Sequence, residues 1–205
     1  MIPIGIVDYN MGNIGSVVNM LSRLGVESRI VSTAKEIDQV DKLILPGVGN
    51  FAKAMHQLNQ TDLVDGIKRN VCRDDFHLMG ICLGMQLLAE SSTEGDAQGF
   101  GLIKGKVVAF ENKIDPTLKI PHMGWNTVEF RSDEMISQEM MDYSRFYFVH
   151  SYYFEVENEA NILGETHYGK KFVSAVRNDR VYGFQFHPEK SHTFGMKIFK
   201  RFSEL

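Results

Sequence analysis

The sequence predicts an α/β fold in which a central, mostly parallel β-sheet is covered by helices and continued by an antiparallel extension. In the first half of the chain, short apolar runs alternate with amphipathic stretches at helical spacing. This alternation is typical of βαβ units, which build a parallel sheet with helices on both faces. In the second half, apolar runs follow one another with only turn residues between them, which indicates antiparallel strands.

The first half supplies the parallel strands. The apolar run Ile4–Val7 predicts a buried strand, and residues 13–24 predict an amphipathic helix because apolar residues such as Val17 and Leu21 recur at helical spacing. Gly25 supplies a C-terminal stop for that helix. In chain order, the remaining elements expected in this half are strands at 27–31 and 42–45, helices at 51–58 and 63–72, and a strand at 76–79.

The second half supplies the antiparallel strands and the last helix. Its expected strands are 106–110, 126–130, 146–154, 162–167, 172–176 and 181–186. Residues 193–202 then predict a closing amphipathic helix. No repeat, low-complexity tract or linker interrupts the chain, so we expect one domain that spans residues 1–205.

Composition excludes several classes of function. The net charge of -4 and the lack of a long basic run offer no electrostatic footprint for nucleic acid. No stretch approaches the roughly 18 apolar residues that span a bilayer, and the first residues carry no basic region typical of a signal peptide. The two cysteines have no metal-ligand spacing. We therefore expect a cytoplasmic protein with free thiols, no metal site and no cofactor.

The most informative segment is 79–86, where an apolar strand runs into a Gly-x-Cys-x-Gly turn centred on Cys82 and a helix follows. This pattern is typical of a nucleophile elbow, whose sharp turn requires residues without bulk at Gly80 and Gly84. At a helix N-terminus, the dipole and free N–H groups favour the thiolate. The alternative is a buried structural cysteine, which is the interpretation we prefer for Cys72, since no glycines flank it.

A cysteine nucleophile needs a base, and the base needs an orienting group. Among seven histidines, His187 stands out because it follows an apolar strand and precedes Pro188 and Glu189. A Glu189 carboxylate folded back onto the imidazole would fix its tautomer and stabilise its protonated form. The alternative interpretation of the His-Pro-Glu sequence is an ordinary surface turn.

A third segment supplies candidate donors for an oxyanion. Gly47, Val48 and Gly49 follow an expected parallel strand, and ligands bind at the carboxyl ends of such strands. Their backbone N–H groups, together with the N–H of Leu83 directly after the nucleophile, could stabilise a developing negative charge. A plain turn is the alternative.

Two of these segments resemble the class I (triad) glutamine amidotransferases. Residues 80–86 resemble the nucleophile block of that family, and residues 185–189 resemble its His/Glu block. The resemblance implies a flavodoxin-like fold with Cys82, His187 and Glu189 as the triad. It also implies hydrolysis of the glutamine side-chain amide through a γ-glutamyl thioester, without a cofactor.

Further segments narrow the resemblance to the glutaminase subunits of imidazole glycerol phosphate synthases. They are the split glycines of 46–49 and the blocks 8–13, 119–126 and 148–152. By this resemblance, the substrate glutamine contacts Gln86, His150, Ser151 and Tyr152, and a partner subunit contacts Asn13, Trp125, Asn126 and Lys190. Without the resemblance, His150 remains a packing histidine at the end of a sheet.

The resemblance also implies a partner, because a chain of 205 residues has no room for a second catalytic domain. The implied partner is a (β/α)8-barrel cyclase that forms a heterodimer with this subunit and receives ammonia through an internal channel, in histidine biosynthesis. Gly15 departs from many histidine-pathway members, which carry a larger residue there. This leaves open a related subunit that supplies ammonia for amidino sugars in surface polysaccharide.

The sequence is also compatible with two functions of a different kind. The first is hydrolysis of γ-glutamyl compounds or peptides with the same elbow. The second is a non-catalytic, regulatory or scaffolding role as a subunit that keeps only the fold. The glycine-rich backbone at Gly47 and Gly49 motivates one more hypothesis. Because glycine turns its peptide planes cheaply, we expect the partner and its ligand to activate hydrolysis by rearranging this strand.

Overall fold

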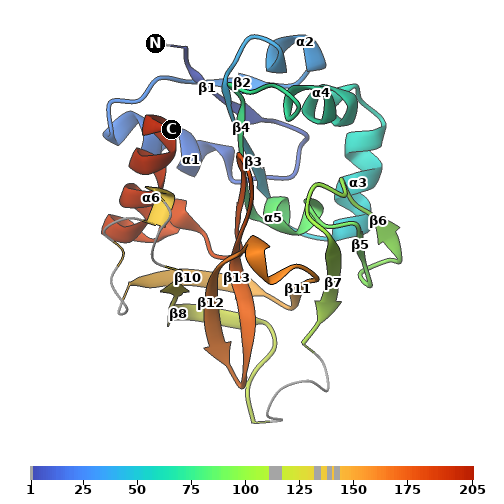
Figure 1. The fold of residues 1–205 in the computed structure, drawn as a ribbon, viewed down its shortest axis with the longest axis vertical. Coiled ribbons are helices and arrows are strands. Elements are labelled where there is room, and N and C mark those ends of the chain that lie inside the picture. Colours follow the sequence, from blue (N-terminus) through green and yellow to red (C-terminus); the bar gives the residue numbers. More distant parts are fainter. Residues whose placement is uncertain (1, 111–116, 132–134, 138–139, 141–143) are drawn as a thin grey trace.

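The computed structural model describes residues 2–110, 117–131, 135–137, 140 and 144–205 (Figure 1). In the described residues, the strands are β1 Ile4–Val7, β2 Ser28–Val31, β3 Lys42–Gly47, β4 His77–Cys82, β5 Ser91–Ser92, β6 Ala97–Gln98, β7 Gly105–Ala109, β8 His122–Thr127, β9 Glu129–Phe130, β10 Arg145–His150, β11 Tyr152–Val156, β12 Ile162–Tyr168, β13 Lys170–Asn178 and β14 Val181–Phe184. The α-helices are α1 Ile14–Arg23, α2 Ala34–Ile37, α3 Phe51–Asn59, α4 Leu63–Asn70, α5 Leu83–Leu87 and α6 His192–Glu204. Short 3-10 helices cover Met135–Ser137, Glu159–Asn161 and Pro188–Lys190.

The large sheet has the strand order β2-β1-β3-β4-β14-β13-β11-β7-β5-β6, with β12 paired to β13 and β9 paired to β12. The five strands from β2 to β14 run parallel to one another. The pairs β14–β13, β13–β11 and β11–β7 are antiparallel. The predicted fold class, a mostly parallel central sheet with an antiparallel extension, is therefore confirmed.

Helices cover both faces of the parallel strands because each strand sends alternate side chains to opposite faces. In β3, Leu43 and Leu45 pack in the core that holds α2, α3 and α4, whereas Ile44 packs in the core that holds α1 and α6. Figure 1 shows α1 and α6 together on one side of these strands and α3 and α4 on the other. Among the described residues, no helix is long and apolar enough to cross a membrane.

Two strand predictions in the second half were wrong in their extent. Residues 126–130 were expected to form one strand, but the chain leaves the two-stranded sheet after β8 and joins the large sheet as β9. Residues 146–154 likewise divide into β10, in the small sheet, and β11, in the large one. The break at Ser151 turns the backbone from one sheet to the other, and a continuous apolar run does not reveal such a change of partner.

Candidate active site

Cys82 occupies a sharp turn between β4 and α5. Its backbone has φ 54° and ψ -108°, a conformation that is rare for residues other than glycine and is typical of strained functional positions. The flanking glycines are required by space. A Cβ atom on Gly84 would collide with the carbonyl group of Leu45, and one on Gly80 would lie 2.6 Å from the Gly84 oxygen. The turn thus has the geometry expected of a nucleophile elbow.

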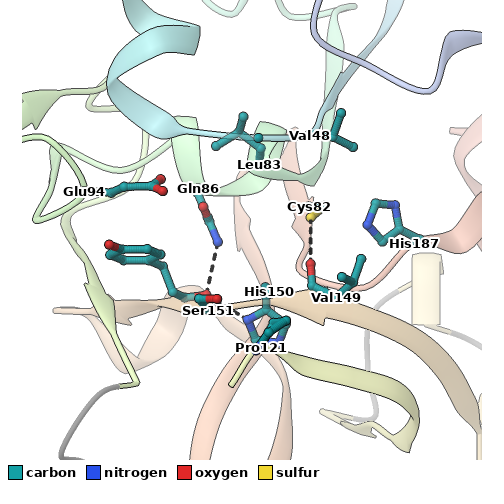
Figure 2. Close-up of a pocket in the computed structure, with 12 residues that line it drawn as sticks. Val48, Cys82, Leu83, Gln86, Glu94, Pro121, Val149, His150, Ser151 and His187 are labelled. Carbon is teal, nitrogen blue, oxygen red and sulfur yellow. Dashed lines mark hydrogen bonds between the residues drawn. The ribbon is translucent and has the colours of Figure 1, made fainter. Parts of the chain in front are cut away.

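The Cys82 sulfur lies at the floor of a cavity between two polar groups. Its thiol is 3.9 Å from the Val149 carbonyl oxygen, and the side-chain amide of Gln185 donates toward the sulfur at 3.8 Å. Figure 2 shows His187 on one side of Cys82 and Gln86 on the other. Cys82 therefore lines the cavity while Val149 and Gln185 contact its sulfur.

His187 and Glu189 form a buried pair next to this thiol. The His187 Nδ1 atom is 2.7 Å from Glu189 Oε1, and the two side chains are only 1% and 2% exposed. Pro188 begins a 3-10 turn, which brings the carboxylate back onto the ring as the sequence spacing predicted. Because Glu189 occupies Nδ1, the second ring nitrogen, Nε2, is left for Cys82 and the cavity.

The charge of His187 follows from its surroundings. Burial lowers the pKa of His187, but the Cys82 sulfur and the hydrogen-bonded Glu189 carboxylate outweigh it and raise the pKa from 6.5 to about 10. The ring is consequently protonated at neutral pH. A protonated imidazole next to a cysteine stabilises the thiolate, which is the reactive form.

The cavity above Cys82 has a volume of about 320 Å³, within the range of small-molecule sites. The four residues expected to contact glutamine all line it, together with Cys82 and His187: Gln86, His150, Ser151 and Tyr152. The Gln86 amide is held in place because it donates to the Tyr152 carbonyl oxygen at 3.1 Å and to Gln185 Oε1 at 3.0 Å.

A chain of hydrogen bonds fixes the backbone on one side of this cavity. His150 Nδ1 lies 2.7 Å from the Tyr152 carbonyl oxygen, His150 Nε2 lies 3.0 Å from His122 Nδ1, and Asn126 Nδ2 lies 3.2 Å from His122 Nε2. A carbonyl oxygen only accepts, so His150 donates through Nδ1 and accepts through Nε2. His122 then donates through Nδ1 and accepts from Asn126. Each ring is therefore neutral and held in one tautomer.

Burial favours the same neutral state. It lowers the pKa of His122 to about 4 and that of His150 to about 3. His150 thus lines the cavity, but both of its ring nitrogens are used within the protein, and its role there is to hold the Tyr152 backbone.

The expected oxyanion donors do not all face Cys82 in this structure. The Val48 N–H group donates to the Met11 carbonyl oxygen at 3.3 Å. Gly49 has φ 105°, which a side chain would strain. Leu83, as the first residue of α5, presents an N–H group without an intrahelical partner. Leu83 and Val48 both line the cavity, but the Val48 N–H group is engaged by Met11.

Two residues of the site were not predicted from the sequence. Glu94 lines the cavity, and its Oε2 atom accepts a hydrogen bond of 2.7 Å from the Phe51 N–H group at the start of α3. This glutamate lies in the turn between β5 and β6, which are only two residues long each and leave no pattern in the sequence. Gln185 lies beside the sulfur, and only its place in the His/Glu block could have pointed to it.

The residues expected at a partner interface differ in their surroundings. Trp125 is 40% exposed and stacks on His192 with 5.4 Å between ring centroids. Lys190 is exposed and lies over the Tyr147 ring, and Asn13 is half-buried directly before α1. Asn126 directs its amide inward, to His122 and to the His167 carbonyl oxygen.

Two further features lie outside this arrangement. Cys72 is an exposed free thiol and does not line the cavity. In the part of the chain that the structure describes, no group of three His, Cys, Asp or Glu residues is placed to hold a metal ion.

A family model described as glutamine amidotransferase class-I matches residues 5–204. The chain belongs to the class I glutamine amidotransferases. Solved structures share the fold of this amidotransferase. A crystal structure of a glutamine amidotransferase has a TM-score of 0.76 at 20% identity and covers 98% of this chain and 97% of its own. The structure of PurLQS from Thermotoga maritima has a TM-score of 0.75 at 19% identity and covers 100% and 99%.

Curated relatives are similar to the amidotransferase over nearly the whole of both chains. The imidazole glycerol phosphate synthase subunit HisH 2 of Methanococcus maripaludis is 48% identical and covers 97% of this chain and 98% of its own. The subunit HisH of Sulfurimonas denitrificans is 46% identical and covers 98% and 97%. The subunit HisH 1 of Campylobacter jejuni is 40% identical and covers 98% and 100%.

Proposed function

We propose that this amidotransferase is the glutaminase subunit of an imidazole glycerol phosphate synthase in histidine biosynthesis. The observation that carries the chemistry is the buried His187–Glu189 pair beside the Cys82 thiol, at the floor of a cavity. The pathway is supported by relatives named as HisH subunits at 40% to 48% identity. Their names favour this pathway over the supply of ammonia for amidino sugars.

In the proposed reaction, Cys82 attacks the side-chain carbonyl carbon of glutamine as a thiolate. The protonated His187 gives its Nε2 proton to the departing nitrogen, the carbon–nitrogen bond breaks, and ammonia leaves a γ-glutamyl thioester. The neutral His187 then takes a proton from water, which attacks the thioester and releases glutamate. Glu189 holds the ring through Nδ1 and stabilises its charged form in both halves of the reaction.

The cavity also supports recognition of the backbone end of glutamine. Glu94 is the only carboxylate among the described residues that line it, and the substrate carries an α-ammonium group, so we assign that contact to Glu94. The α-carboxylate would take backbone N–H groups of the Ser151–Tyr152 turn, which His150 and Gln86 fix through the Tyr152 oxygen.

The Val48 N–H group donates to the Met11 carbonyl oxygen and so is not available to an oxyanion. This supports a resting state in which glutamine is hydrolysed slowly. One oxyanion donor is worth about 3–4 kcal/mol, or about 10²–10³ in rate. Turning the Gly47–Val48 peptide plane would supply this donor, and glycine makes the rotation inexpensive. We infer that a partner subunit and its bound ligand shift this strand into the hydrolysing conformation.

The partner in this proposal is a (β/α)8-barrel cyclase that forms a heterodimer with the amidotransferase in the cytoplasm, a reducing compartment that keeps Cys82 a free thiol. Exposed apolar side chains on the cavity-lining Val48 and on the segment around the cavity-lining Pro121 supply a docking surface: Val48, Ile120, Met123 and Trp125. Isolated exposed apolar residues are common, but such a cluster next to a cavity is typical of a protein–protein contact. Ammonia released at Cys82 would then pass directly into the partner.

The test is glutamate release by the isolated subunit and by the subunit mixed with its cyclase and the cyclase ligand. We expect stimulation of about 100-fold or more in the complex, and no release by a Cys82→Ala complex. The Cys82→Ala complex should still make product from added ammonium, which shows that the cyclase is intact. Equal rates for the isolated subunit and the complex would contradict activation through the strand.

A further inference from the structure

The hydroxyl group of Tyr9 is buried without a hydrogen-bond partner. The residue is only 4% exposed, and its Oη atom has no partner among the described residues. Burial, and to a smaller degree the nearby Cys82, raises the pKa of Tyr9, so the group stays a neutral donor. A buried unpaired donor destabilises a fold, and phenylalanine would fill the same space without this cost.

The Tyr9 hydroxyl lies close to Gly47, in the segment Gly47–Gly49 that carries candidate oxyanion donors and is called the oxyanion strand below. A Cβ atom placed on Gly47 would be 2.6 Å from Tyr9 Oη, and Gly47 pairs directly with Cys82 in the β3–β4 register. Tyr9 does not line the Cys82 cavity; together with Asp8 and Asn10 it lines a separate one. The Tyr9 hydroxyl therefore reaches Gly47 beside the elbow, where the same Cβ position would also lie within 3.0 Å of Gly84 and Leu83 atoms.

The orientation of the Gly47–Val48 peptide plane explains why the Tyr9 hydroxyl has no hydrogen-bond acceptor. In a planar trans peptide, the carbonyl oxygen and the N–H group point in opposite directions. The Val48 N–H group now points to the Met11 oxygen, so the Gly47 oxygen points away from Met11. Turning this plane would release the N–H group from Met11 and move the Gly47 oxygen, which lies on the residue that the Tyr9 hydroxyl approaches.

We propose that Tyr9 is a positioning residue whose hydroxyl donates to the Gly47 carbonyl oxygen once the Gly47–Val48 peptide has turned, and so holds the oxyanion strand in its hydrolysing conformation. In the resting state the donor is unpaired, and in the active state it is paired. The difference in free energy favours the active state. This proposal rests on the proposed glutaminase function.

The test compares Tyr9→Phe with wild type in the complex with the cyclase and its ligand. One neutral hydrogen bond corresponds to about a 2- to 12-fold change, so kcat for glutamine hydrolysis should fall by this factor while KM for glutamine changes less than about 2-fold. The thermal midpoint of the isolated Tyr9→Phe subunit should stay the same or rise. If Tyr9 served only to stabilise the fold, Tyr9→Phe would instead lower the thermal midpoint and leave kcat unchanged.

Tyr182→Phe is the matched control, since Tyr182 is also buried but lies on β14, away from Gly47. Its complex should keep the wild-type kcat, and product formation from added ammonium should be equal in all three complexes. A Tyr9→Phe complex with wild-type kcat, or one whose subunit is less stable, would overturn the proposal for Tyr9 alone. A wild-type complex that releases no glutamate would overturn the proposed function and this proposal with it.

Discussion

His187 is protonated because two neighbours, the Cys82 sulfur and the Glu189 carboxylate, overcome the effect of burial. Its folded pKa of about 10 lies above the ordinary value of 6.5, so the charge stabilises the fold fully below pH 6.5. That contribution is lost as the pH rises through about 10. We expect the His187 ring to titrate near pH 10 by NMR and at lower pH in Cys82→Ala, which removes one of the two neighbours. A wild-type titration near pH 6.5 would contradict the assigned charge state.

His122 and His150 behave in the opposite way. Their pKa values in the folded chain, about 4 and about 3, lie below the ordinary value of 6.5. On acidification the unfolded chain therefore binds protons at pH values at which the folded chain does not. Stability is therefore lost as the pH falls from about 6.5 toward 4. The free energy of unfolding in urea, measured at about pH 7 and pH 5, should drop less in His150→Gln than in wild type, by roughly 1–2 kcal/mol.

The exposed His56 offers the control for this comparison. His56→Gln removes a histidine of the same intrinsic chemistry that belongs to no buried hydrogen-bond chain in the described structure. Its loss of stability over the same pH interval should equal that of wild type. If His150→Gln also lost as much stability as wild type over this interval, His150 would not be held neutral in the folded chain as described.

Single residues with strong local requirements could be predicted from the sequence. The sharp turn at Cys82 could be predicted because it demands glycines on both sides, and the His187–Glu189 contact because the two residues flank a proline. Glu94 could not be found, since its position depends on two short strands held only by tertiary pairing. The glycines at 47 and 49 led us to expect that this strand rearranges, and that remains a prediction; the Val48–Met11 hydrogen bond depends on tertiary contacts that the sequence does not reveal.

At the scale of elements, the elbow and the first helix differ in what their glycines do. A side chain on Gly84 would collide with the Leu45 backbone, whereas a Cβ on Gly15 in α1 would meet nothing within 4 Å. We expect Gly84→Ala to destabilise by about 1–3 kcal/mol and to abolish glutamine hydrolysis. Gly15→Ala should stabilise by about 0.5–1 kcal/mol. Urea unfolding checks both, and equal stability of the two variants would refute the steric account of the elbow.

The elements of the parallel half could be predicted because each carries its own pattern. Strands such as β3 are apolar on both faces, and helices such as α1 and α3 show one apolar stripe. The strands of the antiparallel half were harder to predict because they change pairing partners along the chain. Within one apolar run, β10 pairs with β8 and β11 pairs with β7 and β13. Periodicity shows which residues are buried, but it carries no information about the sheet that receives them.

At the scale of the whole molecule, the surface around the cavity mouth joins the substrate site to the proposed docking surface. Met123 and Trp125 project outward from β8, while His122 and Asn126 of the same strand hold the His150 network inside. Val48, on the oxyanion strand, is also exposed. A partner bound there would touch both the residues Gly47–Gly49 that we propose to turn and β8, whose His122 holds His150 and, through it, the Tyr152 backbone.

We propose above that Cys82 releases ammonia from glutamine for direct use by a cyclase subunit. The most direct measurement supplies the reconstituted complex with glutamine labelled with ¹⁵N in its side-chain amide, in a bath of unlabelled ammonium, and analyses the product by mass spectrometry. We expect ¹⁵N to enter the imidazole ring of imidazole glycerol phosphate, and the Cys82→Ala complex to incorporate only unlabelled nitrogen. Unlabelled product from the wild-type complex, or glutamate release without any imidazole product, would contradict it.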